Sequence, residues 1–465
     1  MKKRVLAILF AIMMVTTFLV ACRNDTGPAA GGDDGGPAGN LAPIGSGAVQ
    51  FDPNAVVNDG DPIEFDYWLW GGPALEQVWQ DLIDEYVQFR PNVTINIVNQ
   101  PWGELWTLLP LAMSGGDGPP IFNVHNAQNA VLVPFMVPYD IPHEDLKADF
   151  DNVEAQIQDG NIYYIDLGFM SSKIYYNREH WAEAGLTEGD YPQTWTELAE
   201  IAQILTQFDD NGHMIRSGFN INGMGGLLTI TFNYQQGSRM FMDDLMTANI
   251  NNEYTRRSVE MLVAFYDHYN VVDRDFGIDA GESFGIGHTS MVYNWGWFNG
   301  HLMGTFPDID FGVFRLPTVD VGTPFAFDRF NGESTMGINA NGTPAEQEVA
   351  QDLVRFLLAN DEFLVEVSRV YNVIPSKRIL QDDPRILEIP SLAVVAGMAD
   401  RIIWPGPFPG TYDQLLGTMM ENVLYLGMPI DEALADIQNR LDNELPAHNF
   451  RSRESAYPHY DEHVN

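Results

Sequence analysis

The sequence contains a single cysteine among its 465 residues. One thiol cannot pair within the chain, so a scaffold held together by internal disulfide bonds is excluded. Basic residues are also scarce, because Lys and Arg total 24 against 64 Asp and Glu, which gives a formal net charge of −40. This imbalance argues against nucleic-acid binding through phosphate neutralisation and against adhesion to an anionic membrane through a basic face. The acidic residues are spread along the chain and indicate a solvated acidic surface.

Motifs of common catalytic and metal-binding chemistry are also missing. The sequence has no Cys/His cluster with zinc spacing, no phosphate-binding glycine loop followed by Lys, and no nucleophile elbow. Carboxylates are numerous, but no motif singles out a pair for glycoside hydrolysis. We therefore expect a protein that is not an enzyme and that carries no cofactor or metal.

Hydrophobic residues make up 45% of the chain, which is enough to bury a core and excludes global disorder. The length exceeds that of one usual hydrophobic core and predicts two compact units. Residues 64–70 alternate as a strand, residues 75–86 keep the spacing of a helix buried on one side, and residues 93–98 alternate again. Strand, helix and strand at this spacing predict an α/β fold with a parallel sheet, and they place Trp79 in its core.

The beginning of the chain resembles a bacterial lipoprotein leader. Met1-Lys2-Lys3-Arg4 is positively charged, and residues 5–21 are uncharged and mainly apolar, which predicts a signal peptide over residues 1–21. Leu19-Val20-Ala21-Cys22 resembles the lipobox, so we expect Cys22 to carry the lipid. A retained signal anchor and a free reactive thiol are the alternatives.

Residues 22–60 are rich in Gly, Pro, Ala, Asp and Asn and lack hydrophobic periodicity, so we expect a flexible tether there. No later stretch is long and apolar enough to span a bilayer. The predicted location is therefore outside the cytoplasm, on the bacterial cell membrane, anchored through lipid rather than embedded.

A series of different short motifs lies along the chain between about residue 60 and residue 445. They comprise residues 65–72, 101–106, 175–178, 183–186, 193–198, 287–291, 294–297, 310–313 and 316–317. In this order they resemble the family 1 extracellular solute-binding proteins, the ligand-capturing lipoproteins of carbohydrate-importing ABC transporters. Members of that family are similar in fold to maltodextrin-binding protein. Two positions depart from the family pattern: Pro119-Pro120 before the third strand, and Phe169-Met170, where a polar pair is common.

The resemblance implies a two-lobed, periplasmic-binding-protein-like fold of class II type with three hinge crossings. Lobe 1 is expected over residues 61–167 and 286–337, and lobe 2 over residues 168–285 and 338–465. The crossings are expected near residues 166–168, 285–287 and 337–339, with ordinary turn glycines as the alternative reading. The expected hinge glycines are Gly168, Gly285, Gly287 and Gly337.

A sugar ligand needs flat aromatic platforms and hydrogen-bonding side chains, and open α/β sheets place ligands just beyond strand ends. For each tryptophan core packing is the alternative, and Trp297 is the one most favoured as a platform. The candidate ligand-binding residues are Trp70, Trp102, Trp106, His125, Asn126, Asn233, Tyr234, Trp295, Trp297, Glu333 and Trp404.

We therefore expect a monomer that captures a carbohydrate, an oligosaccharide, in a cleft between lobes and delivers it to the permease of an ABC importer. The alternatives are a surface adhesin or sensor on the same fold, and an importer binding protein for a non-sugar solute. An anionic cargo would need Arg, which is scarce in these loops apart from Arg329 and Arg401. Asp209-Asp210-Asn211-Gly212 resembles the start of a calcium loop, but Asn220 stands where the twelfth-position acid belongs, which favours a turn.

Overall fold

The computed structural model describes residues 40–125, 128–276, 279–406, 409–448 and 450–464. The expected signal peptide, the lipidation site Cys22 and the first part of the expected tether lie outside these ranges. None of the helices within them has the length and apolar character that crossing a bilayer requires.

The folded body begins at about residue 41, earlier than expected. Ile44 and Phe51 exchange two backbone hydrogen bonds of 2.9 Å, and Phe51 is fully buried. The Arg90 guanidinium lies 4.6 Å from the Phe51 ring centroid and also pairs with Asp352. The expected tether over residues 22–60 is therefore corrected, because its last twenty residues pack on the body through Phe51 and Val57.

The larger sheet has six strands in the order β12-β4-β11-β3-β1-β2. The predicted strand–helix–strand unit is present as β1 (Ile63–Leu69), α1 (Pro73–Phe89) and β2 (Val93–Asn99), and β1 also pairs in parallel with β3 (Ile121–His125). β11 (Asn331–Ile338) lies antiparallel between β3 and β4 (Asp166–Met170), with β12 (Ile374–Pro375) at the edge.

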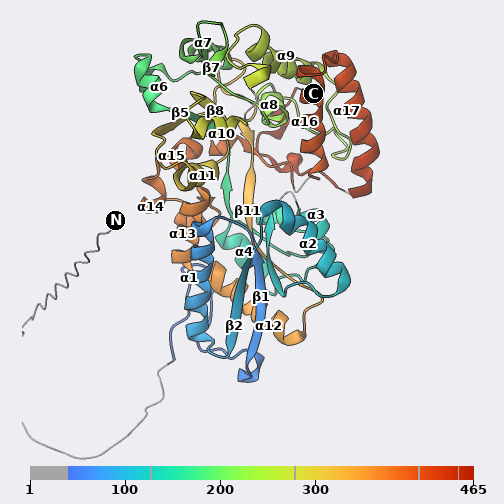
Figure 1. Ribbon diagram of the computed structural model, residues 1–465. Helices are drawn as coiled ribbons and strands as arrows, with labels where there is room; N and C mark the ends of the chain where they lie inside the picture. Colours follow the sequence, from blue (N-terminus) through green and yellow to red (C-terminus); the bar gives the residue numbers. More distant parts are fainter. Residues whose placement is uncertain (1–39, 126–127, 277–278, 407–408, 449, 465) are drawn as a thin grey trace, which may run out of the picture. The chain divides into compact units, whose positions relative to one another are not determined.

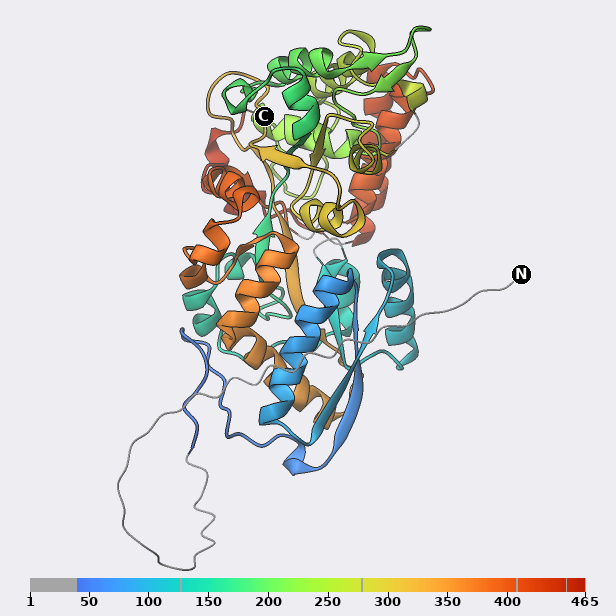
Figure 2. The same ribbon diagram turned by 60° about the vertical axis from the view of Figure 1, so that its left-hand side comes forward.

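Helices cover both faces of this sheet. α1, α12 (Pro344–Ala359) and α13 (Asp361–Tyr371) pack on one face and lie side by side in Figure 2. α2 (Trp102–Gly115) packs on the other face over Phe122 and Val124. Trp79 on α1 is fully buried, with its ring centroid 5.0 Å from that of Phe363 on α13. The prediction that Trp79 belongs to the core is confirmed.

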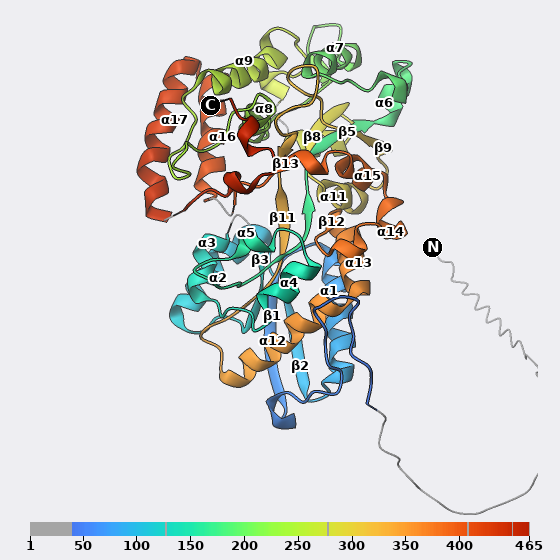
Figure 3. The same ribbon diagram turned by 180° about the vertical axis from the view of Figure 1, so that it is seen from behind.

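A second, three-stranded sheet has the order β8-β5-β9, formed by β8 (Met291–Asn294), β5 (Lys173–Asn177) and β9 (Phe311–Phe314). The major helices around its core are α7 (Trp195–Leu205), α8 (Gly225–Gln235), α9 (Glu253–Asp267), α16 (Thr411–Leu424) and α17 (Ile430–Glu444). Figures 1 and 3 show the two sheets in different halves of the body, with α16 beside α17. We call the half with the six-stranded sheet lobe 1 and the other lobe 2, so the expected two-lobed α/β fold is confirmed.

The remaining elements are short. The helices are α3 (Asn129–Leu132), α4 (His143–Asp149), α5 (Val153–Gln156), α6 (Arg178–Glu183), α10 (Ala280–Gly285), α11 (Phe298–Thr305), α14 (Pro384–Leu387) and α15 (Pro390–Ala396), and the strands are β6 (Gln207–Phe208), β7 (Met214–Arg216), β10 (Asp328–Arg329) and β13 (Ile402–Ile403).

The expected lobe boundaries are partly wrong after residue 285. β8 and β9 pair with β5 in lobe 2, whereas β11, α12 and α13 pack in lobe 1. Most of 286–337 therefore belongs to lobe 2, and 338–396 to lobe 1. The chain passes between the lobes from Met170 to Lys173, at Phe330 and between α15 and β13. Motif order identified the strands, but it carried no information about which sheet each strand joins.

The expected hinge glycines lie away from these three passages or are explained by packing. A Cβ atom on Gly168 would lie 2.5 Å from the Ile374 carbonyl oxygen, so the close approach of β12 to β4 requires glycine there. Gly285 ends α10 in lobe 2, and Gly287 follows with a φ of 77°, a left-handed turn. Gly337 lies inside β11, paired with Phe122. These expected hinges are therefore corrected to packing and turn positions.

The segment with the appearance of a calcium loop is a turn. The Asp209 carboxylate accepts hydrogen bonds from the backbone N–H groups of Asn211 and His213, at 2.9 and 2.8 Å, between β6 and β7. In the part of the chain that the structure describes, no three His, Cys, Asp or Glu side chains are grouped so that they could hold a metal ion.

We expect Trp79→Ala to lower the free energy of unfolding by about 3–5 kcal/mol, because it opens a cavity between α1 and α13. Trp297→Ala is the matched control, since Trp297 is 42% exposed, and it should lose far less, on the order of 1 kcal/mol. Urea unfolding followed by circular dichroism measures both. Equal losses in the two variants would contradict this assignment of core and surface.

Candidate functional site

Four aromatic side chains meet at the edge of the lobe 1 sheet where its parallel strands end. Trp70 follows β1, Trp102 and Trp106 lie on the first turns of α2 after β2, and His125 ends β3. Because the carboxyl ends of parallel strands share one edge of a sheet, residues far apart in the sequence come together here. We call Trp70, Trp102, Trp106 and His125 the aromatic cluster.

The rings of the aromatic cluster touch one another in mainly edge-to-face geometry. The ring centroid of Trp102 lies 5.2 Å from that of Trp70, 5.0 Å from that of Trp106 and 4.8 Å from that of His125. Trp70 and His125 are only 7% and 8% exposed, whereas Trp102 is 45% exposed. The buried members therefore support Trp102, which presents an indole surface to the outside.

Trp106 and His125 also carry polar ring atoms beside the exposed indole of Trp102. The Trp106 Nε1 atom is buried and has no hydrogen-bond partner within the described residues. Burial lowers the pKa of His125 to about 4, so its ring is neutral at physiological pH. A buried N–H group without a partner is costly, and a ligand oxygen would satisfy it.

Glu333 joins this edge from the central strand β11. Its backbone is directly opposite that of His125 in the antiparallel register, and its side chain is 5% exposed. Burial, and secondarily the charge of Asp166, raise the pKa of Glu333 to about 8, and burial raises that of Asp166 to about 7. Asp166 is stabilised by a 2.8 Å hydrogen bond from Gln156 and one of 3.2 Å from Ser334.

A second group of aromatic residues lies at the passages between lobes. The ring of Phe330, between β10 and β11, is 6.0 Å from that of Trp404 and 5.9 Å from that of Phe169. Trp295 is 5% exposed and lies 5.5 Å from the Arg329 guanidinium. Phe330 and Phe169 were missed by the candidate list. Phe330 follows Arg329 in the sequence, and Phe169 directly precedes the first passage between lobes. These positions could have indicated both residues, but the sequence analysis expected the passages at other residues.

Arg329 is committed to an internal ion pair. Its guanidinium donates two hydrogen bonds of 3.0 and 2.9 Å to the Asp413 carboxylate on α16. A bidentate pair of this kind holds both side chains in a fixed geometry. The residue that sequence reasoning considered for an anionic cargo therefore already has an acidic partner.

Two candidates lie in the core of lobe 2 instead. Asn233 and Tyr234 on α8 are 2% and 0% exposed. The Asn233 amide donates to Thr255 at 2.9 Å and accepts from Ser258 at 2.7 Å, and the Tyr234 hydroxyl donates to Glu454 at 2.8 Å. Their hydrogen-bonding capacity serves the internal packing of the lobe, so both are removed from the candidate site.

Of the two remaining candidates, Trp297 stands apart from the aromatic cluster. Trp297 precedes α11 in lobe 2, is 42% exposed, and its ring contacts Phe298 and His301 at 5.8 and 6.1 Å. It is therefore available at the surface rather than buried in a core. Asn126 lies outside the described residues.

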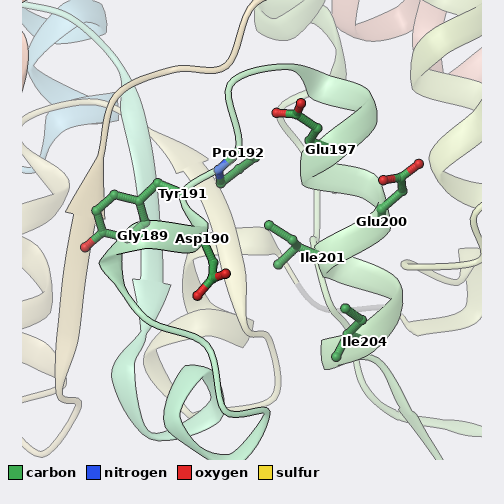
Figure 4. A pocket seen from close by; sticks show the side chains of 8 residues that line it. All are labelled: Gly189, Asp190, Tyr191, Pro192, Glu197, Glu200, Ile201 and Ile204. Carbon is green, nitrogen blue, oxygen red and sulfur yellow. The ribbon is translucent and has the colours of Figure 1, made fainter.

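A hollow of about 290 Å³ on lobe 2 lies between α7 and the preceding loop, and Figure 4 shows the side chains that line it. Two of its carboxylates have local structural roles. Asp190 accepts from the backbone and hydroxyl of Thr187, and Glu197 accepts from the backbone N–H groups of Gln193 and Thr194. These are helix-capping contacts, so this hollow is a weaker candidate than the aromatic cluster.

Comparisons with known proteins identify the family of this chain. The sequence profile of the family described as bacterial extracellular solute-binding protein matches residues 72–362. The diacetylchitobiose binding protein DasA of Streptomyces coelicolor is 22% identical over 327 residues, which span 68% of this chain and 74% of that protein.

Solved structures show the same fold. The maltose/maltodextrin-binding domain MalE from Bdellovibrio bacteriovorus, bound to maltotriose, matches with a TM-score of 0.70 and 19% identity over 83% of this chain and 100% of that chain. The GacH receptor of Streptomyces glaucescens, solved unliganded and with acarbose, matches with a TM-score of 0.68 and 17% identity over 82% and 98%. At these identities the likeness establishes the two-lobed fold alone.

We expect the His125 ring to remain neutral from pH 8 down to pH 5, because burial lowers its pKa to about 4. NMR of ring-labelled histidine, assigned with a His125→Asn variant, should show no titration of its resonances in this range. In urea the same ring should titrate near its unperturbed value of about 6.5. A native midpoint close to the unfolded one would contradict the buried position of this side chain.

Proposed function

Because the chain belongs to the bacterial extracellular solute-binding proteins, we propose that its solute is a carbohydrate, an oligosaccharide, which it delivers to the permease of an ABC importer. The ligand would lie between the lobes, against the aromatic cluster on the lobe 1 side. Trp404, Phe330 and Trp297 would contribute further aromatic surface from the passages and from lobe 2.

The observation that carries this proposal is the exposed indole of Trp102 on its buried support. A pyranose presents an apolar C–H face, and stacking that face on an indole removes apolar surface from water on both partners. Hydroxyl groups at the rim of the sugar would meet the unpaired Trp106 N–H and the carboxyl group of Glu333. Flat apolar surface bordered by a few polar groups is the combination that a sugar requires.

The charged side chains of the candidate site argue against an anionic cargo. Arg329 is occupied by Asp413, and the acidic residue beside the aromatic cluster is Glu333, with Asp166 near it. An anionic peptide or organic acid would meet carboxyl groups there rather than a free guanidinium. The relatives named above include proteins whose descriptions name diacetylchitobiose, maltotriose and acarbose.

We expect maltotriose or N,N′-diacetylchitobiose to raise the unfolding temperature of the protein, since a ligand at 100 times its Kd adds about 2.7 kcal/mol of stability. Trp102→Ala should weaken the binding by about tenfold or more, because stacking contributes about 0.5–1.5 kcal/mol beyond area burial and a factor of ten corresponds to about 1.4 kcal/mol. Isothermal calorimetry measures both affinities.

Phe208→Ala is the matched control, because it removes an aromatic ring that is 42% exposed on the β6–β7 hairpin of lobe 2. It should leave the affinity unchanged. Wild-type affinity in a folded Trp102→Ala protein would remove the platform from the proposal, and a screen in which organic acids or peptides bind but sugars do not would overturn the carbohydrate cargo.

We further propose that the protein acts outside the cytoplasm, anchored to the bacterial membrane by lipid on Cys22. The leader-like start and the lipobox-like Leu19-Val20-Ala21-Cys22 support this. Two acyl chains suffice for stable anchoring without a membrane-spanning helix.

Cys22→Ser should release the protein from the membrane fraction of a bacterial host and abolish labelling by radioactive palmitate. The neighbouring Asn24→Ser substitution is the control and should leave both unchanged. Membrane retention of Cys22→Ser equal to that of the wild type would show that the anchor lies elsewhere.

A further inference from the structure

Glu333 is paired on both sides within the lobe 1 sheet. It lies on β11 between His125 of β3 and Gly168 of β4, in register with both, and three residues beyond Phe330, where the chain passes between lobes. Its side chain is 5% exposed. Its Oε2 atom is buried and has no hydrogen-bond partner in the described part of the chain.

Among the described residues, the elements packed around Glu333 bring no positive charge to it. β4 contributes Asp166, β3 contributes the neutral ring of His125, and α13 contributes Tyr371, whose pKa is raised by burial and by the charge of Glu333. Arg329, four residues earlier, is paired with Asp413. An ionised carboxylate in this position would therefore be desolvated without a neutralising partner.

This cost of desolvation is avoided when the Glu333 carboxyl group stays protonated. Burial and the nearby Asp166 raise the pKa of Glu333 to about 8, so the acid form predominates at neutral pH. A protonated carboxyl group has one O–H donor, which an ionised carboxylate lacks. The buried unpaired oxygen is then a hydrogen-bonding position that a ligand can complete.

We propose that Glu333 binds the cargo as a neutral carboxylic acid that donates its O–H to an acceptor oxygen of an uncharged sugar. The inference rests on the proposed carbohydrate function and adds two properties to it. The site selects cargo with an acceptor, such as an acetamido carbonyl or a hydroxyl oxygen, at this position. The affinity also depends on one proton that must remain on Glu333.

The sign of the pH dependence follows from linkage. The bound form requires the proton, so the affinity is constant below the pKa of the free acid, about 8, and is lost as the pH rises through it. Above that value, Kd should increase by up to tenfold for each pH unit. Asp166 titrates near 7 beside Glu333, so the observed midpoint belongs to the coupled pair.

The test compares wild type, Glu333→Gln and Glu104→Gln by calorimetry with maltotriose and N,N′-diacetylchitobiose from pH 6 to pH 10. Glutamine has the shape of the protonated acid, keeps a donor and cannot titrate. Glu333→Gln should therefore bind within about threefold of wild type at pH 6 and hold that affinity to pH 10, where wild type weakens by up to a hundredfold. Glu104 lies exposed on α2 in the same lobe, and Glu104→Gln should retain the wild-type pH profile.

Two results would overturn the proposal. Loss of binding by a folded Glu333→Gln protein at pH 6 would show that the cargo needs an ionised carboxylate, as an ammonium group would. An unchanged alkaline loss of affinity in Glu333→Gln would assign the proton to another group.

An infrared measurement without sugar separates this inference from the proposed function. The difference spectrum of wild type minus Glu333→Gln should show the C=O stretch of a protonated carboxyl group at pH 6, and this band should disappear by pH 10. Absence of the band overturns the neutral Glu333 whatever the probes do. A band without binding of either probe supports the neutral Glu333 and counts against the carbohydrate cargo.

Discussion

The candidate site depends on strand β11, which lies at the centre of the lobe 1 sheet and begins directly after the passage between lobes at Phe330. Its residues from Gly332 to Ile338 are buried, and it is hydrogen-bonded to β3 on one side and β4 on the other. The preceding β10 pairs with β13 and packs against α8 in lobe 2. Because its ladder is paired on both sides, β11 cannot slip by one residue without turning its buried side chains to the opposite face. That constraint holds Glu333 beside His125 and, through the chain, Phe330 beside Trp404.

The scarcity of basic residues shapes the electrostatics of the same region. The sequence has three lysines after residue 40, and two of them, Lys173 and Lys377, are buried. Lys173 donates to Asn372 at 3.0 Å, and Lys377 pairs with Asp361 at 2.6 Å. Lys377 is committed to its internal ion pair, and burial lowers the pKa of Lys173 to about 7, so neither side chain supplies a fixed positive charge to carboxyl groups elsewhere. Burial without a counter-charge then favours protonation, and this accounts for the raised pKa values of Asp166 and Glu333.

Local patterns in the sequence predicted the local structure well. The strand–helix–strand unit and the buried Trp79 follow from side-chain periodicity. The aromatic cluster could be anticipated because strand ends converge at one edge of a parallel sheet.

Properties set by distant partners could not be predicted in this way. Periodicity identifies a strand but not its neighbour, so β8 and β9 were assigned to the wrong lobe. Polar composition concealed the packing of Phe51 and Val57, and the amide of Asn233 satisfies internal partners that appear only once α8 and α9 meet. The protonation of Glu333 depends on burial and on Asp166, 167 positions away in the chain.

The difference in role between Trp102 and Trp79 also depends on distant partners. Both belong to amphipathic helices, but α13 covers Trp79. Trp102 keeps 45% of its surface exposed while it touches three other rings. Rigid support combined with an uncovered surface distinguishes a binding platform from a core residue, and neither property can be read from one helix alone.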